Sequence, residues 1–150
     1  MLILVIFIES SIAQKWLKEI QPLETKASEL RKGLSINPEK RPPDTLFFKL
    51  KEGNLFVEYS LGNCISGSWG AWDVEEDTVL AITFYPKKKR KPSFFGFSGD
   101  GMKQGYDSGH LTYKSENTGL YYSTQFGKVT TISYTPSRKY EKIRCGDRNK

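Results

Sequence analysis

Hydrophobic and polar residues alternate along most of the chain after Leu46, with the two-residue period that is typical of half-buried β-strands. The segment LFFKLKEGNLFVEYSLG predicts a strand, a turn over residues 51–54 and a second strand over residues 55–60. A third strand is predicted over residues 78–85, where Pro86 ends it. Residues 62–76, which separate the second and third strands, are rich in glycine and serine and predict a long loop.

The same order of elements recurs in the second half of the chain. Residues 111–124 predict a strand, a polar turn and a strand, and residues 127–136 predict a third strand. The two third strands share the pattern V-x-x-I-x-[FY]-x-P: Val79, Ile82, Phe84 and Pro86 correspond to Val129, Ile132, Tyr134 and Pro136. A three-stranded unit is too thin to bury an apolar face, whereas two units can form one sheet. We therefore predict tandem β units over residues 46–86 and 111–136; the alternative is a chance similarity between ordinary antiparallel strands.

The remaining segments predict one helix and several irregular connections. Residues 15–32 carry apolar clusters at helical spacing, with Pro22 as a break and Gly33 as a stop. Residues 33–44 contain three prolines and predict an irregular connection, residues 87–110 an exposed crossover, and residues 137–150 a tail. The predicted fold class is α+β: a single domain over residues 14–150 in which an N-terminal helix packs on an antiparallel sheet built from the two β units.

The N-terminus, MLILVIFIESSIAQKW, has the features of a secretory signal. Its apolar run, residues 1–8, is shorter than the roughly 20 residues that span a bilayer. Ser11 and Ala13 are small residues that fit a cleavage site before Gln14. We expect a signal peptide over residues 1–13 and an exported protein, periplasmic or extracellular, that is not an integral membrane protein. The alternative is a buried N-terminal strand.

Two cysteines, Cys64 and Cys145, are present. In an exported protein an even number of cysteines favours a disulfide, and two unrelated thiols are the alternative. A zinc site is not expected, because two cysteines and the single His110 lie far apart and lack a recognisable ligand spacing.

Residues 55–145 resemble uncharacterised exported proteins of acidobacterial type. The motifs that carry the resemblance are Gly-x-Cys in LGNCISG, Asp-Thr-Val-x-x-Ile in DTVLAI, Gly-Lys-Val-x-x-Ile-x-Tyr-x-Pro in GKVTTISYTP, and the terminal Arg-Cys. Both cysteines belong to these motifs, so the resemblance implies that they pair. The helical motif that precedes the first strand in that family is replaced here by GLSINPEKRPPD. That motif is similar to small outer-membrane lipoproteins of the BamE type and to β-lactamase-inhibitor repeats, an analogy of fold that does not give function.

The sequence does not indicate catalysis. It has one histidine and no G-x-S-x-G nucleophile motif. Glu75, Glu76 and Asp77 are adjacent, so they cannot all face one cleft, and they are typical of a solvated turn. Gly99, Gly101 and Gly105 resemble a dinucleotide fingerprint only in spacing, since no strand leads into them. We therefore predict no enzyme activity, no cofactor and no metal site.

Two segments are candidates for binding, in a chain of formal net charge +6. The first joins a basic run to phenylalanines: Lys87, Lys88, Lys89, Arg90, Lys91, Phe94, Phe95 and Phe97. Cations near exposed rings suit polyanions and single-stranded nucleic acid. The alternative is a solvated turn with its rings against the sheet, and export disfavours nucleic acid. The second candidate, Trp69 and Trp72, is either a stacking platform or a cap on the sheet.

These observations predict an exported, non-catalytic binding or envelope-associated domain. Its expected partner is an unknown protein or an anionic polymer outside the cytoplasm. Two alternatives remain open: a polyanion- or nucleic-acid-binding module that uses residues 87–97, and, by analogy with the inhibitor repeats, an inhibitor of a secreted enzyme.

Overall fold

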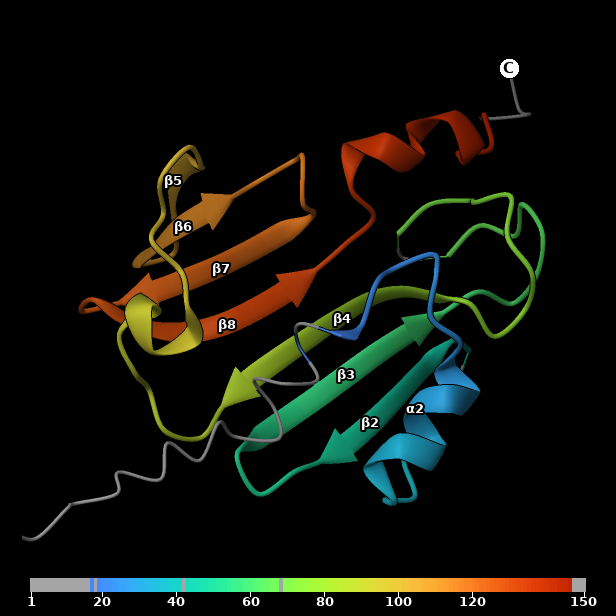
Figure 1. Cartoon of the computed structure of the whole chain (residues 1–150), viewed down its shortest axis with the longest axis horizontal. Coiled ribbons are helices and arrows are strands. Elements are labelled where there is room, and N and C mark those ends of the chain that lie inside the picture. Colours follow the sequence, from blue (N-terminus) through green and yellow to red (C-terminus); the bar gives the residue numbers. More distant parts are fainter. Residues whose placement is uncertain (1–16, 18, 42, 68, 147–150) are drawn as a thin grey trace, which may run out of the picture.

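A computed structural model describes residues 17–146 of the chain, apart from residues 18, 42 and 68. It contains one eight-stranded antiparallel sheet with the strand order β1-β2-β3-β4-β8-β7-β6-β5 (Figure 1). The strands are β1 (Glu39–Arg41), β2 (Thr45–Lys49), β3 (Gly53–Tyr59), β4 (Val79–Pro86), β5 (Lys103–Asp107), β6 (His110–Lys114), β7 (Leu120–Gln125) and β8 (Lys128–Tyr134). Helix α2 (Ala27–Leu34) and the 3-10 helices η1 (Pro92–Phe95) and η2 (Arg138–Ile143) complete the named elements. The predicted α+β class with an antiparallel sheet is confirmed at this level.

The strand pairs β3–β4 and β7–β8 have matching registers. Leu55 pairs with Phe84, and Leu120 pairs with Tyr134. Each pair also has an irregularity that begins three residues further along, at Glu58/Tyr59 in β3 and at Ser123/Thr124 in β7. The strands β4 and β8, which carry the repeated V-x-x-I pattern, lie next to each other, and the hydroxyls of Thr83 and Ser133 form a hydrogen bond of 3.0 Å between them.

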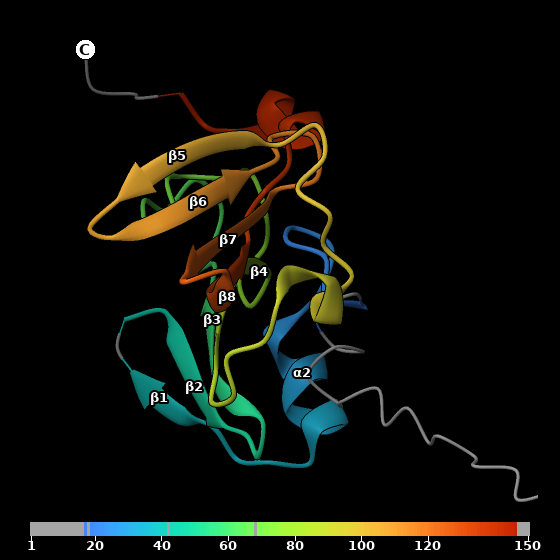
Figure 2. The same ribbon diagram turned by 90° about the vertical axis from the view of Figure 1, so that its left-hand side faces the viewer.

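The core lies on one face of the sheet, where α2 and η1 pack (Figure 2). Alternate residues of β2 and β3 face this core, as the sequence pattern requires. Its fully buried side chains include Leu46, Phe48, Val57, Ile82, Val129 and Ile132, with Ala27 and Leu30 contributed by α2. Burial of each large apolar side chain stabilises the fold by about 1.5–3 kcal/mol, so this face holds most of the stability.

The predicted helix over residues 15–32 is interrupted in the structure, in keeping with the break predicted at Pro22: Leu17 and Glu19 are helical, whereas residues 20–26 are not. Helix α2 begins only at Ala27, and residues 15, 16 and 18 lie outside the described residues. The Leu23 amide donates to the Val79 carbonyl at 2.7 Å, and the Val79 amide donates to the Thr25 carbonyl at 2.8 Å. These backbone groups are therefore bonded to β4 instead of to a helical turn. The Asp77 carboxylate, distant in sequence, accepts from the amide of Ser28 at 3.1 Å and fixes the new helix start.

Two further strands replace irregular segments of the prediction. Strand β1 lies within residues 33–44, and η1 and β5 lie within the crossover, residues 87–110. Both strands are at the edges of the sheet, and every residue of each is exposed. Since neither buries a face, neither shows the apolar alternation that reveals a strand in sequence.

Cys64 and Cys145 form a disulfide with their Cα atoms 5.6 Å apart, as the sequence predicts. The Cys64 amide donates to the Trp72 carbonyl at 2.8 Å, and the Cys145 amide donates to the Ala71 carbonyl at 2.9 Å. The disulfide thus joins the loop between β3 and β4 to the segment that follows η2, and the two run side by side in Figure 1.

Within the described part of the chain, no helix is long and apolar enough to cross a membrane. The predicted signal peptide, residues 1–13, lies outside the described residues.

Candidate ligand-binding cleft

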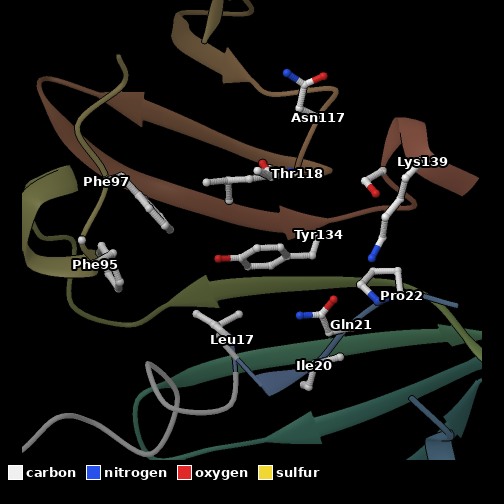
Figure 3. A pocket seen from close by; sticks show the side chains of 13 residues that line it. Leu17, Ile20, Gln21, Pro22, Phe95, Phe97, Asn117, Thr118, Tyr134 and Lys139 are labelled. Atoms are coloured by element: carbon white, nitrogen blue, oxygen red, sulfur yellow. Dashed lines mark hydrogen bonds between the residues drawn. The ribbon is translucent and has the colours of Figure 1, made fainter. Parts of the chain in front are cut away.

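A cleft of about 520 Å³ opens on the core face of the sheet, between the segment 17–22, η1 and the end of β8 (Figure 3). The segments that surround it are far apart in sequence, and the sheet brings them together. Its lining comprises Leu17, Ile20, Gln21, Pro22, Phe95, Gly96, Phe97, Asn117, Thr118, Leu120, Tyr134, Ser137 and Lys139.

Apolar side chains form the inner surface of the cleft. The aliphatic part comes from Leu17, Ile20 and Leu120, and the aromatic wall comes from Phe95 and Phe97. The Phe97 ring stacks on Tyr122 with a centroid distance of 4.9 Å, and Tyr122 stacks on Tyr113 at 4.6 Å. Because the wall is part of this stack, it is held in place before any ligand arrives, which lowers the entropic cost of binding.

Tyr134 places the main polar atom inside the cleft. Its ring lies across the cleft with the hydroxyl directed toward Phe95 and Phe97 (Figure 3). Burial raises the pKa of Tyr134, so the hydroxyl stays protonated at neutral pH and can donate a hydrogen bond. Within the described part of the chain this hydroxyl has no hydrogen-bond partner. Because Tyr134 is only partly buried and its hydroxyl faces the cleft, this group is available to donate to an oxygen of a bound ligand.

The rim of the cleft is polar but nearly neutral. The amides of Gln21 and Asn117 and the hydroxyl of Thr118 lie along it. The Lys139 ammonium is 3.1 Å from Glu24 Oε1, and the Tyr140 hydroxyl donates to the same carboxylate oxygen. Since Glu24 compensates the charge of Lys139, the cleft favours an apolar ligand with a few hydrogen-bonding groups over a strongly charged one.

The predicted basic–aromatic stretch divides between two environments. The five cations, Lys87 to Lys91, are exposed, although Lys87 Nζ donates to the Leu50 carbonyl at 3.1 Å. Phe94 is 49% exposed, whereas Phe95 and Phe97 turn inward and line the cleft. The sequence therefore predicted Phe95 and Phe97 as binding residues, but for a polyanion and not for a ligand of this cleft.

The two tryptophans do not form a platform together. Trp72 is 4% exposed, its indole Nε1 donates to the Trp69 carbonyl at 2.8 Å, and the Arg144 guanidinium lies 5.5 Å from its ring centroid. Burial leaves Trp72 no face for a ligand, which argues against the first of the two alternatives, the stacking platform. Trp69 remains 36% exposed in the same loop.

Two of the residues weighed for catalysis make local polar contacts. His110 Nδ1 lies 3.1 Å from the Ser108 carbonyl at the start of β6. Glu75 pairs with Lys26 at 3.0 Å, and this hydrogen bond lowers the pKa of its carboxyl. Across the described ranges, no group of three or more histidine, cysteine or acidic side chains could hold a metal ion.

The opposite face of the sheet carries a smaller hollow of about 180 Å³, lined by Thr45, Phe56, Glu58, Ala81, Thr83 and Tyr85. Burial, and secondly the charge of Asp44, raises the pKa of Glu58 to about 7. Beside the hollow, the Arg41 guanidinium lies over the Phe47 ring at 4.4 Å and over the Phe56 ring at 5.3 Å. This face thus holds the half-buried carboxyl of Glu58, whose ionised form is disfavoured.

Replacing Glu58 with glutamine is expected to stabilise the protein at pH 8. The raised pKa of Glu58 means that the folded state holds a proton that the unfolded state releases. The contribution of Glu58 to stability is therefore complete below pH 4.5 and is lost as the pH rises through about 7. After a discount for solvent screening, Glu58→Gln should raise the free energy of unfolding by about 1 kcal/mol at pH 8. This gain should fall toward zero at pH 4.5. Urea unfolding at both pH values measures it. Glu76→Gln, at an exposed position, serves as the control; an equal gain from this variant would contradict the assignment.

No family model, curated protein or solved structure matches this chain, so the resemblance to exported acidobacterial proteins stays a prediction.

Proposed function

We propose that this chain is an exported, non-catalytic binding domain of the cell envelope that holds an apolar ligand in the cleft beside Tyr134. The observation that carries the proposal is the combination of an apolar cleft of about 520 Å³ with a tyrosine hydroxyl that is directed into it and has no hydrogen-bond partner among the described residues. Clefts of this volume, mostly apolar and with a few convergent polar groups, are the usual form of small-molecule sites.

The chemistry of the lining defines the ligand class. Leu17, Leu120 and the two phenylalanines offer apolar contact to a hydrocarbon chain or a ring system. Tyr134 would donate to one carbonyl, ether or hydroxyl oxygen of that ligand. The polar rim, with amides and a hydroxyl, suits a neutral head group at the mouth. The proposed ligand is therefore a neutral amphiphile rather than a free anion.

Export is the second part of the proposal. The Cys64–Cys145 disulfide supports it, because such bonds persist mainly in oxidising compartments. The apolar N-terminal run and the cleavage pattern before Gln14 support it independently.

We also infer that β2–β4 and β6–β8 are two related three-stranded units. The shared register and the equivalent irregularities of β3–β4 and β7–β8 support this. The relation bears on the site: α2 supplies core residues beside the first unit, while the cleft lies over β7 and β8 of the second. The proposed ligand would then fill space on the second unit that a helix covers on the first.

The test uses the full chain purified from an exporting host. Its intact mass should begin at Gln14 and rise by two hydrogens on reduction. N-Phenyl-1-naphthylamine, a neutral apolar dye, should fluoresce on binding, and Leu120→Trp, which fills the cleft, should weaken its binding about tenfold. Leu111→Trp adds the same ring at a residue outside the cleft lining and should leave dye binding unchanged. Equal dye binding by both variants would contradict the cleft as the ligand site. An intact mass that corresponds to a chain beginning at Met1 would contradict export.

The inhibitor alternative stays a prediction. A protein partner would lie against the second face of the sheet, where Phe47, Phe56 and Tyr85 are partly exposed. The cleft is the better supported site because it is concave and because the Tyr134 hydroxyl is directed into it.

A further inference from the structure

The turn between β7 and β8 contains a residue that the fold does not need. Strands β7 and β8 are joined by two residues only, Phe126 and Gly127, with φ angles of 51° and 71°. Two positive φ angles define a type I′ turn, in which asparagine and glycine are preferred. A phenylalanine in this region is strained, and Phe126 is 96% exposed, so its ring contacts almost nothing within the protein. A residue that disfavours its own backbone conformation and gains no contact inside the protein points to a role in binding an external partner.

The turn lies next to the basic run. The Val129 amide, at the base of the hairpin, donates to the Arg90 carbonyl at 2.7 Å. The β7–β8 turn, η1 and the loop before η1 all lie at the end of the molecule that faces the viewer in Figure 2. Phe94, 49% exposed and with the Arg90 guanidinium 5.5 Å from its ring centroid, adds a second apolar contact at this end.

The two segments that meet at this end carry cations and no acidic residue. The segments 86–99 and 124–131 contain no aspartate or glutamate. Within the described part of the chain, no ion pair involves the exposed cations Lys88, Lys89, Arg90, Lys91 and Lys128. Two acidic residues lie on neighbouring turns: Glu52, whose carbonyl accepts from the Lys87 amide, and Asp107, which pairs with His110 at the start of β6. A protruding aromatic ring surrounded by cations complements a surface with an apolar interior and anionic head groups.

We propose that this end of the sheet docks on an anionic phospholipid membrane, with Phe126 inserted and Lys88, Lys89, Arg90, Lys91 and Lys128 against the lipid phosphates. The inference deepens the envelope association proposed above and does not depend on the cleft. A membrane is favoured over single-stranded nucleic acid because Phe126 stands at the apex of a turn, whereas base stacking needs rings along a groove that follows the backbone.

The experiment measures co-flotation of the full chain with vesicles, either phosphatidylcholine alone or with 30% phosphatidylglycerol. Binding is expected only to the anionic vesicles, and it should fall steeply as sodium chloride is raised. Phe126→Asn, which suits the positive φ and so preserves the turn, should weaken binding about tenfold. Replacing Lys88, Lys89, Arg90 and Lys91 with glutamine should weaken it more than about 100-fold.

Two matched controls separate docking from general charge and hydrophobicity. Replacing Lys32, Lys40, Lys114 and Lys142 with glutamine removes the same charge elsewhere, and Tyr106→Ser removes an aromatic ring that is 77% exposed on β5. Both variants should bind as the wild type does. Absence of vesicle binding, equal loss in the charge control, or an unchanged Phe126→Asn variant would each overturn the proposal. Retention on single-stranded DNA without vesicle binding would assign this end to nucleic acid. Because the dye test of the cleft uses other residues, either proposal can fail alone.

Discussion

Replacing both Cys64 and Cys145 with serine is expected to lower the free energy of unfolding by about 4.5 kcal/mol. The two residues are 81 positions apart in sequence, and closing a loop of that length removes much of the conformational freedom of the unfolded chain. The midpoint of thermal unfolding should fall by roughly 10–15 °C for a chain of this size. Urea and thermal unfolding, followed by circular dichroism, measure both quantities.

Reduction supplies the control for this prediction. Wild-type protein in reductant should unfold as the double variant does, since both lack the same bond. The double variant itself should not respond to reductant. A loss below about 1 kcal/mol would mean that the two segments are held together without the disulfide, for example by the backbone bonds of Cys64 to Trp72 and Cys145 to Ala71.

The strands that bury one face were predictable from the sequence. Thr45–Lys49 and Gly53–Tyr59 alternate apolar and polar side chains because one face of each meets the core. The repeated V-x-x-I pattern also marked the two strands that pair at the centre of the sheet. The alternation and the V-x-x-I pattern can both be recognised in the sequence because each lies within a single strand.

The helix and the edge strands depended on contacts that are distant in sequence. Helix α2 starts where the Asp77 carboxylate meets the amide of Ser28, and no short pattern around residue 27 shows that partner. Strands β1 and β5 are exposed throughout, so pairing with a neighbour, and not burial, holds them in the sheet. Composition alone made these segments look irregular.

The cleft was only partly visible in the sequence. Phe95 and Phe97 were marked because they follow a basic run, yet their rings face the cleft and not the solvent. Tyr134 is one position in an ordinary alternating strand, and the direction of its hydroxyl into the cleft is a property of three-dimensional packing. Sites assembled from several segments need the fold before their residues can be grouped.

Gly119→Ala is expected to destabilise the protein by about 3–5 kcal/mol, or to prevent folding. Gly119 is buried, its φ is 73°, and a Cβ there would overlap the backbone carbonyl of Thr135. The backbone cannot shift without loss, because the Gly119 amide donates to the Ser115 carbonyl at 2.9 Å and its carbonyl accepts from the Thr135 amide at 3.0 Å. The strained φ and at least one broken hydrogen bond therefore add to the steric cost. Urea unfolding measures the loss.

Gly101→Ala separates the steric cost from the conformational one. Gly101 has a φ of 69°, close to that of Gly119, but a Cβ there would meet nothing within 4 Å. Its variant should lose only about 1 kcal/mol, the cost of a non-glycine residue at positive φ. Equal losses in the two variants would show that φ alone matters and that the segment 115–119 yields to the added methyl group. A much larger loss at Gly119 would show instead that its close approach to Thr135 fixes the position of the chain where β7 begins and β8 ends.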